Sequence, residues 1–588
     1  MMEITAEKNR SRSLTIAGLS LIVIFGAYLR LFDLSSKSVT HVEMYVPGIR
    51  MPQGISVPGE RLTLAKALTG TFSSDTHPPG YYIFMWAWTK CFGTSALAIR
   101  LPSAMFGTAC IPLVFWLGML TRQRIAAWIA AILVAVNAHH IFWSQVARMF
   151  TLVCFLGLLA TILLLLIAKN SLESRSLGFL YVLVILLGVF CHIFFWSILG
   201  THVLWTFFYA WSQRQPLPSA GKLQVLAGIL GSPLLAFAAY QNGNELATLS
   251  SNALVYAREF LQFSFLFPLV GFSSGVYPHE SHVVLTDDPH LSIARWSFFL
   301  LSLLLFFLGI ASIQKSDQKL LTETHGSSPK TWLLAAGLGT LAILFFVFMA
   351  KTFLKSAPNP TLRTTELMTA LPFVLAVLAI LLEKTWKRLA DWHKFTISCR
   401  FLVSEQALVL ALAVVPFATL AFLSLLKPTF NARGMLLLGP YLLLVLAWGI
   451  ARLSRYRIAA ASLLIILSVA HYWGWKEYNH VATGRADYKA LAAALAPRIE
   501  TADLVFIHPS WYSTPIFFYL DSGWDRFVGQ DYEAACRRDP HARVWTVVFY
   551  NYDEDVPKQA VDALSNYQVL QTIEAPGARA LLYSPKNN

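Results

Sequence analysis

The chain has 588 residues, of which 56% are hydrophobic and only 13% are charged. A soluble protein of this length needs a polar surface, whereas the apolar runs here are about 20 residues long, the length that spans a bilayer. The sequence therefore predicts an all-α polytopic membrane protein. The net charge of +14 does not indicate nucleic-acid binding, because basic residues of membrane proteins gather in cytoplasmic loops.

The apolar runs predict about 13 transmembrane helices, with the N-terminus cytoplasmic and the C-terminus on the outer side. Residues 14–33 form the first span, a signal anchor without a cleavage site. A loop at 34–78 then faces outward. Residues 79–93 predict a short amphipathic helix at the outer interface, because the stretch is too short to span comfortably. The other spans are expected at residues 95–120, 124–142, 147–168, 177–193, 195–211, 223–241, 292–313, 332–354, 366–382, 406–426, 434–451 and 458–475.

These spans define a transmembrane domain over residues 1–475, with outward loops at 34–94 and 242–291. Residues 476–588 differ in composition and predict a small extracytoplasmic α/β domain. No nucleotide-binding glycine pattern occurs in this domain, which favours a lid or docking module. Its expected elements are helices at 487–499 and 557–565 and strands at 504–507, 544–550, 567–573 and 579–583.

A polar stretch at residues 75–82, with the sequence DTHPPGYY, opens the short helix. Two consecutive prolines suit the start of a helix and not its middle. They hold Asp75, His77, Tyr81 and Tyr82 at the membrane edge. Ionisable groups placed there are costly, so this stretch is a candidate functional site.

Several cations lie on the expected outer side, against the usual bias of basic residues toward the cytoplasm. This excess indicates an anionic ligand at the outer face. Snorkelling to outer headgroups is the alternative for each of them. The residues are Arg100, Arg148, Arg258, Arg363, Lys427 and Arg433.

Six segments together resemble a known family. They are 28–32 (YLRLF), 77–82 (HPPGYY), 100–104 (RLPSA), 145–150 (QVARMF), His192 and 431–434 (NARG). In order and spacing they are similar to glycosyltransferase family 39, which includes protein O-mannosyltransferases and the lipid A aminoarabinose transferase. The membrane architecture of that family is called GT-C. The resemblance covers residues 14–211 well and 427–451 loosely.

One position departs from the family pattern. The family carries an Asp-Glu pair in the first outward loop, and here the pair is Val42-Glu43. The missing Asp is the residue that the family is thought to use as catalytic base or metal contact. The resemblance implies that Glu43, His41 or Asp75 takes this role, or that the chemistry has been lost or altered. A carboxylate can deprotonate an acceptor hydroxyl within hydrogen-bond reach, and imidazole titrates near neutrality.

The resemblance also implies residues that bind the donor phosphate or the substrate. A guanidinium matches phosphate bidentately and keeps its charge in a low dielectric. Interface-belt tyrosines and ordinary packing histidines are the alternatives. The candidates are His77, Tyr81, Tyr82, Arg100, Arg148, His192 and Arg433. A divalent metal is a possible cofactor of unknown site; the polar run His279, Glu280, His282, Asp287 and Asp288 is a weaker candidate for it.

The resulting hypothesis is a membrane glycosyltransferase of the bacterial inner membrane. It would move a sugar from a polyprenyl-phosphate donor to a protein, lipid or glycan acceptor on the outer (periplasmic) face, with inversion of the anomeric centre expected from the family. Two alternatives stay open. One is a degenerate relative that binds polyprenyl lipid without turnover. The other is a lipid or solute transporter, which would show broken helices or an internal repeat.

Overall fold

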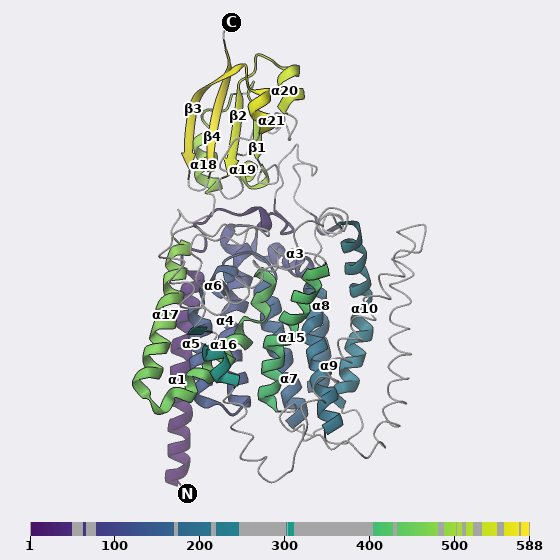
Figure 1. Ribbon diagram of the computed structural model, residues 1–588, viewed down its shortest axis with the longest axis vertical. Coiled ribbons are helices and arrows are strands. Elements are labelled where there is room, and N and C mark those ends of the chain that lie inside the picture. The colour runs from purple at the N-terminus through teal and green to yellow at the C-terminus, as the bar shows by residue number, and fades with distance from the viewer. Residues whose placement is uncertain are drawn as a thin grey trace.

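The computed structural model describes most of the N-terminal half and most of the C-terminal quarter. The described residues are 2–49, 63–65, 78–169, 175–212, 219–245, 301–302, 304–310, 404–426, 432–479, 487–500, 502–508, 513–520, 532–549, 558–575 and 578–586. The described helices stand side by side, and the strands lie beyond one end of them (Figure 1). The two termini lie at opposite ends of the structure.

The helical part follows the expected order. Its helices are α1 (Met2–Leu31), α3 (Gly80–Phe92), α4 (Ala96–Leu120), α5 (Arg124–Val136), α6 (Ala138–Ser144), α7 (Phe150–Lys169), α8 (Arg175–Cys191), α9 (Phe195–Ser212), α10 (Ser219–Glu245), α15 (Glu405–Leu426), α16 (Gly439–Arg452) and α17 (Arg457–Asn479), with 3₁₀ turns η1 (His41–Glu43), η3 (Ala432–Leu437) and η4 (Leu453–Arg455). Helix α4 is central, since it packs against α1, α5 and α7. Its proline-containing sequence starts at Ser95, whose side chain caps the Ala98 amide.

Three described helices are long and apolar enough to cross a membrane: Arg12–Leu31 of α1, α4 and α7. The bent pair α5–α6 would make a fourth span by length and composition. The expected spans at 332–354 and 366–382 lie outside the described residues, as does most of 292–313. The short helix expected at 79–93 is present as α3.

The span expected at 124–142 is broken. It forms two helices, α5 and α6, that meet at an angle of 54°. Asn137 has an extended backbone and caps α6 by accepting a hydrogen bond from the His140 amide at 2.8 Å. The carbonyls of Val134 and Ala135 freed at the break accept hydrogen bonds from the Arg30 guanidinium, each at 2.9 Å. The break is therefore satisfied within the protein, and an apolar run alone did not reveal it.

Gly80 lets α3 lie directly against the end of α8. A Cβ atom at this position would be 2.5 Å from the Phe190 carbonyl oxygen. We expect Gly80→Ala to lower the stability by about 1–3 kcal/mol, because backbone must move to admit the methyl group. Thermal unfolding in detergent tests this. The control is Gly200→Ala in α9, where nothing lies within 4 Å and no loss is expected; equal midpoints for the two variants would contradict the close-contact argument.

The C-terminal unit begins at Asp487, and its described residues up to 586 form a four-stranded sheet with helices on both faces. Its strands are β1 (Leu504–His508), β2 (Val544–Phe549), β3 (Tyr567–Ala575) and β4 (Ala578–Pro585), in the order β1-β2-β4-β3. Strands β1 and β2 are parallel, and the other pairs are antiparallel. All four strands lie where the sequence predicts them.

Successive side chains of a strand point to opposite faces of the sheet, so each face of this sheet belongs to a different apolar cluster. Val505 and Ile507 join one apolar cluster with α18 (Tyr488–Leu495) and α19 (Ser513–Leu520). Leu504 and Phe506 join a second cluster with α20 (Tyr532–Arg538) and α21 (Lys558–Ala563). The helices α19 and α20 were not predicted, because each is only two turns long and carries no strong period.

Candidate functional site

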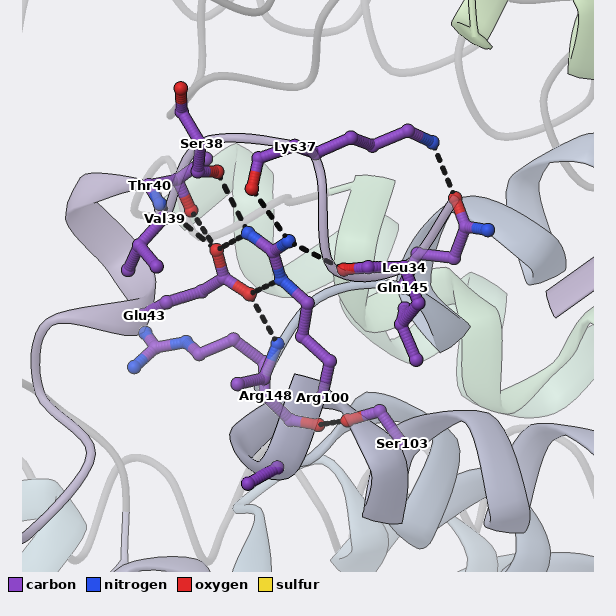
Figure 2. A network of polar contacts seen from close by, with 12 residues as sticks. Leu34, Lys37, Ser38, Val39, Thr40, Glu43, Arg100, Ser103, Gln145 and Arg148 are labelled. Carbon is purple, nitrogen blue, oxygen red and sulfur yellow. Dashed lines mark hydrogen bonds and ion pairs between the residues drawn. The ribbon is translucent and has the colours of Figure 1, made fainter. Parts of the chain in front are cut away.

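Glu43 ends the 3₁₀ turn η1 and is completely buried. Its Oε2 accepts hydrogen bonds from the Thr40 amide at 2.9 Å and from the Thr40 hydroxyl at 3.1 Å. Its Oε1 accepts one from the Ala147 amide at 2.9 Å. The bond from the Thr40 amide is one half of a capping box, in which an acid three residues on returns to the capping residue. This arrangement fixes the loop after α1 against the turn before α7 (Figure 2).

Arg100 of α4 forms a bidentate ion pair with Glu43, and both side chains have no exposed surface. Arg100 Nε donates to Glu43 Oε1 and Nη2 donates to Oε2, each at 2.7 Å. Nη1 donates to the carbonyls of Leu34 and Lys37, both at 2.9 Å, and Nη2 also donates to Ser38 at 2.7 Å. All five N–H groups of the guanidinium thus have protein acceptors.

This geometry limits what the pair can do chemically. The Glu43 carboxylate accepts five hydrogen bonds from Thr40, Ala147 and Arg100 together, which fills the roughly four lone-pair positions of a carboxylate. A general base needs a free lone pair facing the acceptor proton. The pair is therefore built to hold the loop in one conformation.

Arg148 lies beside this pair and is also buried, with 4% of its surface exposed. Its Nη1 donates to the Tyr82 hydroxyl at 3.2 Å, and its carbonyl accepts a hydrogen bond from Ser103 at 3.1 Å. Figure 2 shows the Arg148 side chain running alongside the Glu43–Arg100 pair. Tyr81 packs edge-on against Tyr82, with ring centroids 5.9 Å apart, and its hydroxyl is buried.

The structure thus brings five of the predicted site residues to one end of the helices: Glu43, Tyr81, Tyr82, Arg100 and Arg148. His192 is buried at the turn between α8 and α9, where its Nδ1 accepts a hydrogen bond from the Phe194 amide at 3.1 Å. Its ring packs on Phe150, with centroids 5.6 Å apart. These contacts give His192 a packing environment close to the start of α7.

Other predicted residues are only partly covered. His41 begins η1 and Arg433 lies in η3, but their side chains are outside the described part of the structure. Asp75 and His77 lie outside the described residues altogether, as does the polar run at 279–288.

One group of described side chains has the ligand types of a metal site. Cys110, His140 and Cys154 place their possible ligand atoms within 4.8 Å of one another, and all three are buried. The position of the proton on the His140 ring determines whether the cluster can bind a metal ion. Arg30 Nη2 lies 3.1 Å from His140 Nδ1, and since a guanidinium only donates, Nδ1 must accept. The proton then sits on Nε2, which faces Cys154 Sγ at 3.9 Å.

A neutral imidazole with its proton on Nε2 cannot ligate through that nitrogen. The cluster therefore does not fit a metal ion in the described arrangement, and we derive no reaction step through one. It fits a buried hydrogen-bonded network that links Arg30 to His140 and Cys154 and stiffens the break between α5 and α6.

Sequence reasoning missed several partners of the site. The Thr40-x-x-Glu43 spacing is a capping-box pattern and could have revealed the Glu43 environment. Arg30 lies in the segment 28–32 that carries the resemblance, but the sequence assigns it no role. Apart from the Gly26 carbonyl, its side-chain partners lie 104 to 110 residues away. The bond from Lys37 Nζ to Gln145 Oε1, at 2.7 Å, likewise joins the loop after α1 to the α6–α7 turn.

No protein-family model and no curated protein matches the chain. Solved structures do. The oligosaccharyltransferase AglB from Archaeoglobus fulgidus, in complex with an inhibitory peptide and a dolichol-phosphate, is 12% identical over 97% of this chain and 74% of its own, with a TM-score of 0.45. ArnT from Cupriavidus metallidurans, bound to undecaprenyl phosphate, is 12% identical over 96% of this chain and 97% of its own, with a TM-score of 0.36.

Proposed function

We propose that the chain is a membrane glycosyltransferase that moves a sugar from a polyprenyl-phosphate donor to an acceptor at the outer face. The observation that carries the proposal is the cluster of a buried acid, two buried guanidinium groups and a tyrosine hydroxyl at one end of an apolar helix assembly. Buried charges of this kind are costly in a membrane protein and mark functional sites by default.

Within the cluster, Arg148 and Tyr82 are the proposed phosphate contacts. Guanidinium pairs strongly with phosphate oxygens, and a buried one stabilises charge that develops on a departing phosphate. Arg100 is not proposed as a phosphate contact, because all five of its N–H groups are engaged with the protein. Arg433 and His77 remain proposed as further donor contacts on the strength of the sequence resemblance.

The proposed base is Asp75 or His41, and Glu43 is proposed to position the loop that carries them. Support comes from the Glu43 carboxylate, both of whose oxygens are taken by Arg100, Thr40 and Ala147. The loop from η1 to α3 contains both alternative bases. The Val42 position, where the family has Asp, then requires that the base come from elsewhere in this loop.

Among the described helices, the broken pair α5–α6 favours a transporter, since unwound carbonyls in transporters coordinate ions. Here the Val134 and Ala135 carbonyls accept hydrogen bonds from Arg30 instead. This use of the freed backbone favours the glycosyltransferase over the transporter.

Transfer of radiolabelled sugar from polyprenyl-phosphate donors in proteoliposomes tests the proposal. We expect wild-type turnover, with Asp75→Asn or His41→Gln lowering kcat by about 10²–10⁴-fold, the usual contribution of a general base. Lys90→Gln, on the exposed end of α3, is the control and is expected to leave turnover unchanged. Donor binding without wild-type turnover would favour the degenerate relative, and absence of donor binding would refute both.

A further inference from the structure

Three consecutive residues of the first outward loop, 38–40, connect the buried ion pair to the C-terminal unit. We call this stretch the linking segment. The Ser38 carbonyl accepts a hydrogen bond from Arg100 Nη2 at 2.7 Å. The Ser38 hydroxyl faces the other way and donates to Asp487 Oδ1, also at 2.7 Å. A single residue therefore contacts both the ion pair and the C-terminal unit.

The Ser38 hydroxyl makes two hydrogen bonds to the C-terminal unit. Its Oγ also accepts a hydrogen bond from the Lys489 amide at 3.1 Å, so the hydroxyl uses both its donor and an acceptor position. Asp487 is fixed independently, because its Oδ1 accepts from the Ala490 amide at 3.0 Å as the cap of α18. Ser38 is buried, with 5% of its surface exposed.

The next two residues repeat the pattern. The Val39 amide donates to the Tyr519 hydroxyl of α19 at 2.7 Å. The Thr40 amide and hydroxyl donate to Glu43. The linking segment thus makes hydrogen bonds alternately to α18 and α19 on one side and to the Glu43–Arg100 pair on the other. Some 450 residues of chain separate the two partners of Ser38–Asp487.

We propose that the C-terminal unit holds the Glu43–Arg100 pair in its working geometry through the linking segment, which makes Ser38, Asp487 and Tyr519 positioning residues. The inference rests on the proposed function for its catalytic meaning. A shift of about 1 Å far from the reacting atoms can cost 10²-fold in rate, so small movements of this segment matter. The C-terminal unit is then a structural part of the active site and a route by which its ligands or modification could alter turnover.

Hydrogen–deuterium exchange on the full-length protein in lipid nanodiscs tests the coupling without relying on activity. The variants are Ser38→Ala, Tyr519→Phe and the two combined. They remove the hydroxyl contacts and leave the Asp487 cap of α18 intact. We expect exchange in peptides covering the linking segment and Ala147 to become about tenfold faster in the double variant, since the Ala147 amide reports on Glu43 directly.

Two matched controls lie nearby. Ser36→Ala removes a hydroxyl in the same loop that bonds only locally, to the Asp33 carbonyl. Tyr567→Phe removes a hydroxyl within the C-terminal unit that bonds the Pro540 carbonyl. Both control variants are expected to show the same hydrogen–deuterium exchange rates in these peptides as the wild type. Ser38→Thr retains a hydroxyl and is expected to restore slow exchange.

Sugar transfer supplies the second readout. We expect the double variant to lose about tenfold or more in kcat with donor affinity unchanged, because the phosphate contacts are untouched. Unchanged exchange at Ala147 would overturn the proposal, and so would faster exchange with unchanged kcat. A wild type without transferase activity would refute the proposed function, whereas the exchange comparison would still decide whether the C-terminal unit holds the pair.

Discussion

Replacing Glu43 by glutamine is expected to destabilise the protein by about 3–5 kcal/mol and to abolish measurable transfer. The described partners of the Glu43 carboxylate are all donors: the Thr40 amide and hydroxyl, the Ala147 amide and two Arg100 nitrogens. Glutamine keeps one acceptor oxygen and brings an NH₂ group that must face donors. The Arg100 charge would also remain buried without its counter-ion. Thermal unfolding in detergent and transfer in proteoliposomes measure the two effects.

Glu405→Gln is the matched control. Glu405 pairs with Lys169 at 3.2 Å, but both side chains are partly exposed, at 26% and 31%. Such a pair contributes about 0–1 kcal/mol, so little change in the unfolding midpoint is expected. If Glu43 were the catalytic base and not a positioning residue, Glu43→Gln would lose turnover while keeping the wild-type midpoint. A double replacement of Glu43 and Arg100 by leucine is expected to recover part of the lost stability, because no charge is then left unpaired.

The sequence was a good guide to helices and a weaker guide to the site. Hydrophobic length and basic turns located α4, α7 and α8 to within a few residues of the expected spans. The break at Asn137 was not predicted, because the apolar run continues through it. The cation that hydrogen-bonds the freed carbonyls comes from α1. Periodicity reports the environment of a helix face and carries no information on a partner about a hundred residues away.

The site illustrates the same limit. The sequence singled out Glu43 and Arg100 separately, as a candidate catalytic base and a candidate ligand for the donor phosphate or substrate. Their pairing gives both residues a part in holding the loop, and it depends on the fold bringing Arg100 of α4 against Glu43 of η1. Ser38 carried no signal at all, because a lone serine in a polar loop has many ordinary uses. Side-chain roles that depend on contacts between distant segments require the folded structure.

Replacing Arg148 by methionine is expected to weaken binding of the polyprenyl-phosphate donor by about 10- to 100-fold. A hydrogen bond to a charged group contributes about 1.5–3 kcal/mol, and each 1.4 kcal/mol is tenfold in affinity. Arg148→Lys is expected to recover only part of this, since an ammonium cannot bind two phosphate oxygens in a planar fork. Tyr82→Phe removes the hydroxyl that holds Arg148 Nη1 and is expected to weaken binding a few-fold. Equilibrium binding of a fluorescent donor analogue in nanodiscs measures all three.

Arg124→Met provides the control for a change of charge, because this arginine is exposed at the start of α5, at the far end of that helix from the break near the site. Its donor affinity is expected to equal that of the wild type. The salt dependence of donor affinity distinguishes a direct contact between Arg148 and the phosphate from the general electrostatic field of the protein. Salt screens a buried pair much less than it screens exposed charges. Donor affinity that is equal in wild type and Arg148→Met would remove Arg148 from the phosphate site. Arg433 would then be the remaining candidate among the predicted guanidinium groups outside the Glu43 pair, and the same replacement there would decide whether the cluster binds phosphate through η3 instead.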